Sequence, residues 1–448
     1  MQVQAITRLT ALTLGIAGAL AAGNAQASGF QIRENSVKNM GRAFSGMAIS
    51  RDDASAVSNN PAAMSQFEQS AVRVDSSVVN LTADFKGSAR TAVGTPVTGG
   101  NGGDPGAPAL VPAIAAVFPM SGALDRLTFG VSVDAPFGLK TEYDPAWMGR
   151  YNAIKSDVKI VDLNFSTAVA ITDRFSVGMG LIYQRADVTL SNAIDFGTAI
   201  CASGNPANCF NPSFPFRPQQ NDGTVSVSGS DSGLGWRVGA LLRPNDKVSI
   251  GISHRSEIDH DLRGNADFTV PASVAAVTGT TYRDGPITAP LTTPSVTTVS
   301  VQYDISPAFR MMLDYQGTDW HSLQAVRIYR NGGGVLGNEP FNWKDTDFWS
   351  LGGEFDLSPA LTLRAGVARD ESPTNDTFRT PRLPDNNRRL YSLGMTWNVS
   401  EALSVDAAYT RVTIDNPTVN ATSSSGSRIT GTYNGHADLF GVAAQFKF

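Results

Sequence analysis

Residues able to do chemistry are few in this sequence, and Cys201 and Cys209 are its only two cysteines. Both lie in a segment rich in proline, asparagine and glycine. In an exported protein such a pair forms a local disulfide that pins a loop. A metal or redox role is the alternative, but a metal site needs more ligands than this segment offers. We therefore predict a structural disulfide, with no metal and no cofactor. The four histidines lie elsewhere, at His254, His260, His321 and His436.

A hydrolytic site would need a serine, a histidine and an acid brought together on one rim or face. His254 and His260 belong to one predicted strand, and the sequence assigns no serine partner to either. We therefore predict that the chain is not an enzyme, and keep a barrel-embedded lipase or protease as an alternative of another class.

The N-terminus has the form of an export signal. Arg8 precedes an apolar run over residues 9–22, and Ala25-Gln26-Ala27 supplies small residues at the positions read by signal peptidase. A membrane anchor is the alternative, but the run is shorter than the roughly 20 apolar residues that span a bilayer. We predict a signal peptide over residues 1–27 and a mature chain that begins at Ser28.

The composition of the rest of the chain limits how it could cross a membrane. The formal net charge is −5 and nothing strongly basic points to nucleic acid. Mean hydropathy is −0.11, and no apolar stretch after the leader reaches helical spanning length. A membrane-spanning protein with this profile has to be a β-barrel, because only closed sheets satisfy every backbone group while polar and apolar side chains alternate.

Such alternation fills the body of the chain. Val161, Leu163 and Phe165 alternate with polar or small residues, and short turns such as Thr172-Asp173-Arg174 separate one strand from the next. A soluble β-sandwich also alternates, but its turns do not separate into one short set and one long set. Long polar segments follow every second strand, near residues 86–111, 143–156, 191–222, 269–291, 330–345, 371–387 and 415–429.

Fourteen strands follow from this pattern, the even number that single-chain bacterial barrels require. They lie near residues 70–85, 112–119, 126–142, 157–171, 174–190, 223–243, 247–268, 292–305, 309–329, 346–357, 361–370, 388–399, 403–414 and 430–448. We predict an antiparallel outer-membrane barrel over residues 70–448. The last strand ends on Phe448, and a terminal aromatic resembles the signal by which the barrel-assembly machinery recognises its clients.

Residues 28–69 lack strand alternation. Ser36 to Ile49 is typical of a short amphipathic helix and turn, and apolar side chains such as Phe30 and Phe44 need a dry environment. We predict a small, partly helical plug inside the barrel, with a periplasmic tail as the alternative.

Several motifs then match one family. They are Gly29-Phe30-Gln31, residues 41–46 (GRAFSG), Asp52-Asp53-Ala54, Asn60-Pro61-Ala62, Gly235-Trp236, residues 254–257 (HRSE), Gly264-Asn265, residues 370–373 (DESP) and Leu383-Pro384-Asp385. In this order they resemble the long-chain fatty-acid transporter family, which includes fatty-acid and aromatic-hydrocarbon channels. The resemblance spans the mature chain and identifies Asn60, Pro61 and Ala62 with the family's plug motif.

The resemblance implies a kink in the third strand that opens a hole in the barrel wall. In this chain Ala135, Pro136, Phe137 and Gly138 interrupt that strand. Proline removes a ladder donor and glycine permits bending, so a kink also follows physically, with a strand end as the alternative. A lateral exit into the membrane suits an apolar solute, because the solute then avoids periplasmic water.

The ligand would first meet a groove formed by the long loops. Phe196, Phe210, Phe214 and Phe216 surround the cysteine pair and are our groove candidates, with packing within the loop as the alternative. Arg185 and Arg255 are candidate partners of a fatty-acid carboxylate, or else charges in the lumen paired with Asp or Glu. The resemblance places the family's fatty-acid-binding arginine of the fifth strand near Leu190, which is not basic, so alkanes, aromatics and other neutral ligands stay open beside fatty acids.

Together these features predict a bacterial outer-membrane channel that works as a monomer. It would take up hydrophobic small molecules, either long-chain fatty acids or hydrocarbons, by passive diffusion, and its other contacts would be outer-membrane lipid and the barrel-assembly machinery. A general porin for polar solutes is the alternative within transport, and the predicted plug argues against it.

Overall fold

The computed structural model describes residues 29–448, so the predicted signal peptide over residues 1–27 lies outside the described residues. The chain forms a closed antiparallel barrel of fourteen wall strands, as predicted. The first strand, β1 (Ala71–Arg90), closes the barrel by pairing with the last, β19 (Arg428–Lys447), over its whole length. The amide of Phe448 then donates to the carbonyl of Ser70 at 2.9 Å.

Nine wall strands are continuous and five are each broken into two segments. The other continuous strands are β2 (Ala109–Pro119), β3 (Leu127–Glu142), β4 (Lys155–Thr172), β5 (Phe175–Ile194), β6 (Gly223–Asn245), β15 (Leu361–Asp370) and β16 (Arg388–Asn398). The broken strands are β7 (Val248–Arg255) with β8 (Ile258–Thr269), β9 (Gly285–Thr293) with β10 (Val296–Ser306), β11 (Phe309–Thr318) with β12 (Ala325–Arg330), β13 (Val335–Pro340) with β14 (Thr346–Ser358), and β17 (Leu403–Ile414) with β18 (Thr418–Thr422).

The helices are all short. Three lie in the N-terminal segment, α2 (Val37–Met40), α3 (Ala56–Asn59) and the 3₁₀ helix η1 (Pro61–Gln66). The others lie in connections between strands: η2 (Gly122–Leu124), α4 (Phe196–Ser203), η3 (Pro206–Phe210), α5 (Ala272–Thr278) and η4 (Trp320–Ser322). None of the helices within residues 29–448 is both long and apolar enough to cross a membrane.

The strands carry apolar side chains outward and polar or small ones inward. On β5, Met179, Leu181 and Tyr183 are exposed, whereas Ile182 and Gln184, which alternate with them, are fully buried. The outward row continues around the wall with large apolar side chains: Phe165, Trp236, Leu313, Trp349, Leu393 and Phe440. Exposed apolar rows of this kind are unfavourable in water and match the lipid-facing band of an outer-membrane barrel.

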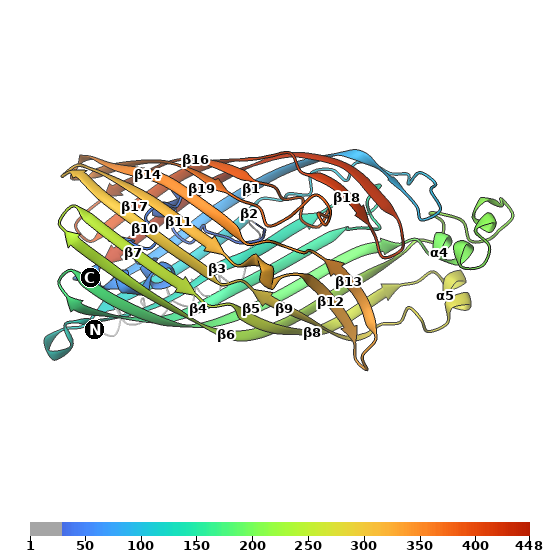
Figure 1. Cartoon of the computed structure of the whole chain (residues 1–448), viewed down its shortest axis with the longest axis horizontal. Coiled ribbons are helices and arrows are strands. Elements are labelled where there is room, and N and C mark those ends of the chain that lie inside the picture. The colour runs from blue at the N-terminus through green and yellow to red at the C-terminus, as the bar shows by residue number, and fades with distance from the viewer. Residues whose placement is uncertain (1–28) are drawn as a thin grey trace.

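The two ends of the barrel differ in their connections. The short turns predicted after β4, β6, β10, β14 and β16 lie at the end that holds the C-terminus, and α4 and α5 lie at the opposite end (Figure 1). Several wall strands run further into the long connections than predicted. Residues predicted as loops form most of β9 and all of β13 and β18, because these extensions have no apolar row facing lipid that would reveal them in the sequence.

The N-terminal segment lies inside the barrel, where Figure 1 shows it in blue towards the C-terminal end. We call residues 29–67 the plug segment. Its apolar side chains Phe30, Met40, Phe44 and Met64 are all buried, which supplies the dry environment expected from the sequence. Helix α2 packs against β16, β17 and β19, and η1 packs against β4, β5 and β6. The segment thus contacts opposite parts of the wall.

Candidate functional site

The plug segment is seated on the wall at its 60–62 motif. The side-chain amide of Asn60 donates to the carbonyls of Ala48 at 2.6 Å and Ala240 at 3.1 Å, which joins the plug to strand β6. The wall makes room with Gly239, where a Cβ would lie 1.9 Å from the Asn60 Oδ1 atom. Glycine is therefore required at this close approach. The motif anchors the plug near the short-turn end of the barrel.

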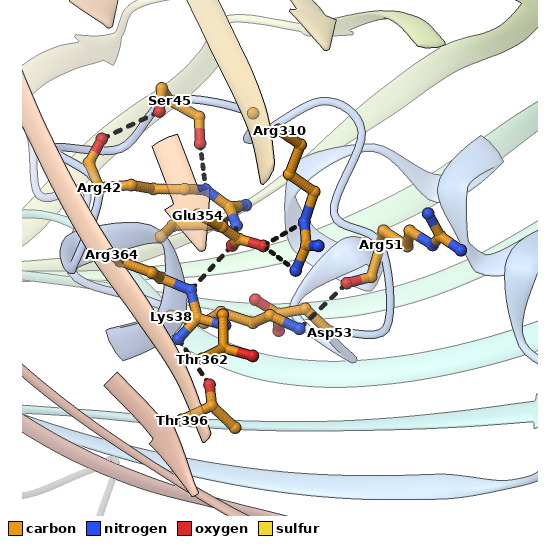
Figure 2. Close-up of polar contacts among 12 residues, drawn as sticks. Lys38, Arg42, Ser45, Arg51, Asp53, Arg310, Glu354, Thr362, Arg364 and Thr396 are labelled. Atoms are coloured by element: carbon orange, nitrogen blue, oxygen red, sulfur yellow. Dashed lines mark hydrogen bonds and ion pairs between the residues drawn. The ribbon is translucent and has the colours of Figure 1, made fainter. Parts of the chain in front are cut away.

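A buried carboxylate, Glu354 of β14, holds the middle of the plug. Figure 2 shows the guanidinium groups of Arg42, Arg310 and Arg364 converging on it. Arg42 belongs to the plug, whereas Arg310 and Arg364 are wall residues at 2.6 Å and 2.8 Å from the Glu354 oxygens. Three positive charges surround one buried carboxylate, and Arg310 alone among them is partly exposed, so the attachment depends on Glu354.

A second ionic cluster surrounds Arg73 of β1. Its guanidinium lies 3.3 Å from Asp53 of the plug, 2.8 Å from Asp75 and 2.6 Å from Asp406. Asp75 also accepts the amide of Val37 at 2.7 Å, at the start of α2. Burial by itself would raise the pKa of Asp53, but the nearby positive charges, chiefly that of Arg73, outweigh it and lower the pKa to about 2.

Strand β3 separates from β2 partway along its length. The two strands pair from Thr128 to Val133, and within the described residues β2 is not paired with β3 beyond that point. Strand β3 nevertheless continues to Glu142 against β4, with a register shift between Asp134 and Phe137. The strand is therefore irregular at its proline but does not end there.

The start of the plug segment pairs with the freed part of β3. The amide of Ile32 donates to the carbonyl of Pro136, and the amide of Gly138 donates to the carbonyl of Phe30, both at 2.8 Å. Gln31 and Phe137 form an antiparallel bridge between these two bonds. Residues 30–32 thus satisfy backbone groups that a regular barrel would satisfy with β2.

An apolar cluster lies beside this pairing, on the side of the long loops. Phe30 packs edge to face on Phe137 at 5.8 Å and on Trp320 at 4.8 Å, and Trp343 lies 4.9 Å from Trp320. We call the group the aromatic cluster. Its apolar surroundings are Leu139, Ile160, Leu262, Leu291, Leu323 and Leu383. The cluster joins the plug, the irregular part of β3 and the loop side of the wall.

A cavity lies between the plug and the wall at the same height as Pro136. Two arginines, Arg237 and Arg255, line it together with residues of β3 and of the plug: Asp134, Pro136 and Phe137, and Gln31, Ile32, Arg33, Asn35, Ser58 and Asn59. Arg255, a predicted carboxylate partner, forms a buried ion pair with Asp162 at 3.0 Å. Arg255 is therefore a lumen charge paired with an acid, which is the alternative predicted for it.

Arg185, the other predicted carboxylate partner, lies on the outer surface. Its side chain is 45 % exposed and pairs with Asp187, which is 53 % exposed and also on β5. Arg185 follows Tyr183 by two residues and so belongs to the same outward row. It cannot reach a ligand in the lumen, and the prediction that it faces the lumen is corrected.

The aromatic residues of the β5–β6 connection do not form one surface. Phe196 is fully buried and packs on Tyr282 at 4.8 Å, so it fills the loop interior, the alternative given for it above. Phe214 and Phe216 contact each other at 6.4 Å, and Phe210 is 62 % exposed. A disulfide joins Cys201 to Cys209 in the same connection.

The comparison with protein families gives one match over most of the chain. Residues 18–448 match the family model described as outer membrane protein transport protein (OMPP1/FadL/TodX). Among curated proteins, the chain is 29% identical to outer membrane protein P1 of Haemophilus influenzae, with 88% of each chain covered. It is 26% identical to the long-chain fatty acid transport protein of Escherichia coli K12, with 89% of this chain and 91% of the other covered.

Solved structures share the fold. A FadL homologue from Pseudomonas aeruginosa superposes with a TM-score of 0.86 at 24% identity, covering 94% of this chain and 99% of that one. The toluene transporter TodX of Pseudomonas putida superposes with a TM-score of 0.68 at 16% identity, covering 94% and 99%. At these identities the likeness concerns the plugged barrel and not the choice of ligand.

Proposed function

The chain belongs to the OMPP1/FadL/TodX family of outer-membrane transport proteins, and from this premise we propose that it lets hydrophobic small molecules diffuse across the outer membrane. Relatives are named for the transport of long-chain fatty acids and of toluene, so both kinds of ligand are candidates here. The observation that carries the proposal is the pairing of the plug segment with β3 where β3 has left β2.

The proposed route has three stages. Exposed aromatic residues of the long connections, with Phe210 the most exposed, collect the ligand. The ligand then enters the region of the aromatic cluster, and the release of residues 30–32 from β3 uncovers the part of the wall where β2 and β3 are not paired. An apolar molecule leaves there into the lipid, since this path avoids transfer into water.

A general porin fits the lumen less well. A porin needs an open, polar bore, whereas here the plug segment fills the space between opposite walls and is tied to them by Glu354 and Arg73. A hydrolase is also less well supported. Within residues 29–448, His260 contacts Gln184 at 2.9 Å and His254 contacts Thr297 at 2.9 Å, and neither forms a serine–histidine–acid set.

The proposal also includes the assignments that rest on the sequence. The plug motif at 60–62 seats the plug, the Cys201–Cys209 disulfide holds the loop that carries Phe210, and Phe448 presents the terminal aromatic to the assembly machinery. We propose that the functional unit is a monomer, because one chain closes its own barrel through β1 and β19.

Uptake of labelled hydrophobic compounds by cells with and without this protein tests the proposal, with Gly138→Trp as the decisive variant. A Cβ at Gly138 would lie 2.8 Å from the Ile32 Cδ1 atom, so a tryptophan fills the space between β3 and the plug segment. We expect uptake to be lost while the barrel still assembles. Gly334→Trp is the matched control, because an added Cβ at this hairpin position has no atom within 4 Å. Cells with this variant should take up the compounds normally. Unchanged uptake by Gly138→Trp would remove the lateral route.

A further inference from the structure

A groove lies on the outer face of the wall, over β11 and the neighbouring strands β14 to β17, and has a volume of about 830 Å³. Two small outward-facing residues leave this space, Gly353 of β14 and Ala365 of β15, which are direct partners in the ladder between the two strands. The side chains that border the groove are mainly large and apolar: Met311, Leu351, Phe355, Leu363 and Leu393. A depression of this kind within the lipid-facing band fits a hydrocarbon chain.

One end of the groove reaches the edge of the apolar band on the side of the long connections. Tyr391, Tyr409 and Arg411 line the groove there. Tyr315 and Trp349, which contact each other at 4.8 Å, continue the row of aromatic side chains on β11 and β14. Because tyrosine and tryptophan mark the level of lipid head groups, Arg411 stands at that level, while the apolar part of the groove lies within the hydrocarbon.

Two more arginines lie at this end of the groove. Arg369 of β15 and Arg389 of β16 are direct partners in the ladder, and their side chains are 67 % and 60 % exposed. Arg411 follows on β17, two residues before Thr413, the partner of Arg389. We call these three arginines the arginine group. Like charges directly opposite each other in a sheet are destabilising, and the outward rows of β15, β16 and β17, all within the described residues, contain no acid that would separate them.

Acidic residues contact the arginine group from its sides. Glu371, Asp415 and Asp438 each lie near one arginine, at 3.5 Å, 3.1 Å and 2.7 Å respectively. Glu371 and Asp415 follow the ends of β15 and β17, and Asp438 lies on β19. An exposed ion pair contributes at most about 1 kcal/mol, and a guanidinium carries five donors, so the group can still bind a further anion.

We propose that the groove and the arginine group bind one phosphorylated glycolipid of the outer leaflet, a molecule that joins several acyl chains to a sugar phosphate. An acyl chain lies over Gly353 and Ala365, and the phosphate bridges Arg369 and Arg389. A phosphate accepts paired hydrogen bonds from arginine and, placed between two guanidinium groups, removes the repulsion between them. Basic clusters at the level of the head groups are a recognised basis for binding anionic lipids. The lipid stays on the outside of the wall, so this site is separate from the proposed path of the transported molecule.

The test measures lipid binding to the purified protein in detergent by native mass spectrometry. The probes are diphosphoryl lipid A, the same lipid without its phosphates, and glucosamine phosphate, which has no acyl chain. One variant carries both Arg369→Gln and Arg389→Gln, and a second, Gly353→Leu, fills the groove. Arg185→Gln is the matched control, because Arg185 is an outward arginine of β5 that also pairs with one acid. Heat-resistant mobility on gels establishes that each barrel has assembled.

We expect the double arginine variant to bind lipid A about tenfold more weakly, which corresponds to the loss of one charge-assisted hydrogen bond. Its binding of the dephosphorylated lipid should equal that of the wild type. Gly353→Leu should weaken the binding of both lipids, and Arg185→Gln should change neither.

Three results would overturn the proposal. Wild-type affinity of the double variant for lipid A would show that the arginines do not hold the phosphate. Glucosamine phosphate that binds as tightly as lipid A would reduce the site to a simple anion site without a role for the groove. A wild-type dimer that dissociates in Gly353→Leu would assign the groove to a second copy of the chain.

Discussion

The amide of Gly138 donates to the carbonyl of Phe30 at 2.8 Å, so a wall strand of the barrel is completed by the first residues of its own plug. With the bond from the Ile32 amide to the Pro136 carbonyl, this pairing comprises two backbone hydrogen bonds. Each backbone bond contributes only about 1 kcal/mol net, so the packing of the Phe30 side chain on Phe137 and Trp320 holds residues 30–32 on β3 more firmly than the two bonds do. The larger attachments, at Glu354 and Arg73, lie elsewhere.

Phe30→Ala is expected to loosen this gate selectively. Phe30 packs on Phe137, Trp320 and Trp343, and truncation of a buried phenylalanine costs about 3–5 kcal/mol. Residues 29–32 should become mobile, which a spin label at position 31 would report, and neutral hydrocarbons should cross faster. Phe196→Ala is the matched control, because Phe196 is also buried but packs within an outer loop. A label as immobile in Phe30→Ala as in the wild type would contradict the role given to Phe30.

Glu354→Gln is expected to release the middle of the plug. Three arginines lose their shared counter-charge, and removal of one partner from a buried ionic group costs about 3–5 kcal/mol. The barrel should remain closed while ion conductance in planar bilayers rises. Asp356→Asn is the control, because Asp356 is 33 % exposed, pairs with Arg310 and accepts a hydrogen bond from Thr362 that an asparagine can also accept, so its loss should have little effect. Equal conductance in the two variants would mean that the plug does not depend on Glu354.

The sequence predicted the barrel well because a two-residue period reports which face meets lipid. The same period also places Arg185 outward, in the row of Tyr183, and places Arg237 inward, between the outward Trp236 and Val238. The period does not show which inward-facing charges form ion pairs. Whether Arg237 or Arg255 finds an acid depends on which strands meet across the lumen, and Asp162 reaches Arg255 from β4, 93 residues away in the chain. The buried Nη1 atom of Arg237, which has no hydrogen-bond partner among residues 29–448, could therefore be recognised only in three dimensions.

The pairing of residues 30–32 with β3 was equally hidden. The sequence indicated an irregular strand at Pro136 and a plug rich in apolar residues, but no local pattern connects the two. The contact is set by the way α2 and the 60–62 motif position the plug inside the barrel. Phe196 was misassigned for a related reason, because an aromatic residue in a long connection can face either solvent or the loop interior.

Acid is expected to weaken the attachment of the plug at Asp53. Its pKa is lowered to about 2 in the folded protein from an ordinary value of 3.8, so the carboxylate stabilises the docked plug fully above pH 3.8. The contribution, about 2 kcal/mol, is lost as the pH falls towards 2. Conductance of the wild type should therefore rise between pH 4 and pH 2. Asp53→Asn should conduct more at neutral pH and show a smaller rise over this interval; a rise as steep as that of the wild type would assign the acid response to another group.

Asp134→Asn is expected to increase the preference of the channel for carboxylates over alcohols of equal length. Asp134 lines the cavity that holds Arg237, and its negative charge opposes any anion that enters. An asparagine keeps an oxygen that can accept from Asn164, so the irregular part of β3 should persist while the repulsion disappears. Coulomb repulsion between partly screened charges is on the order of 1 kcal/mol or more, which corresponds to a several-fold gain in carboxylate uptake. Asp187→Asn removes an equivalent charge from the outer surface and should leave the ratio unchanged. A carboxylate-to-alcohol uptake ratio that is the same in Asp134→Asn as in the wild type would show that the charge of Asp134 does not oppose a carboxylate in the cavity.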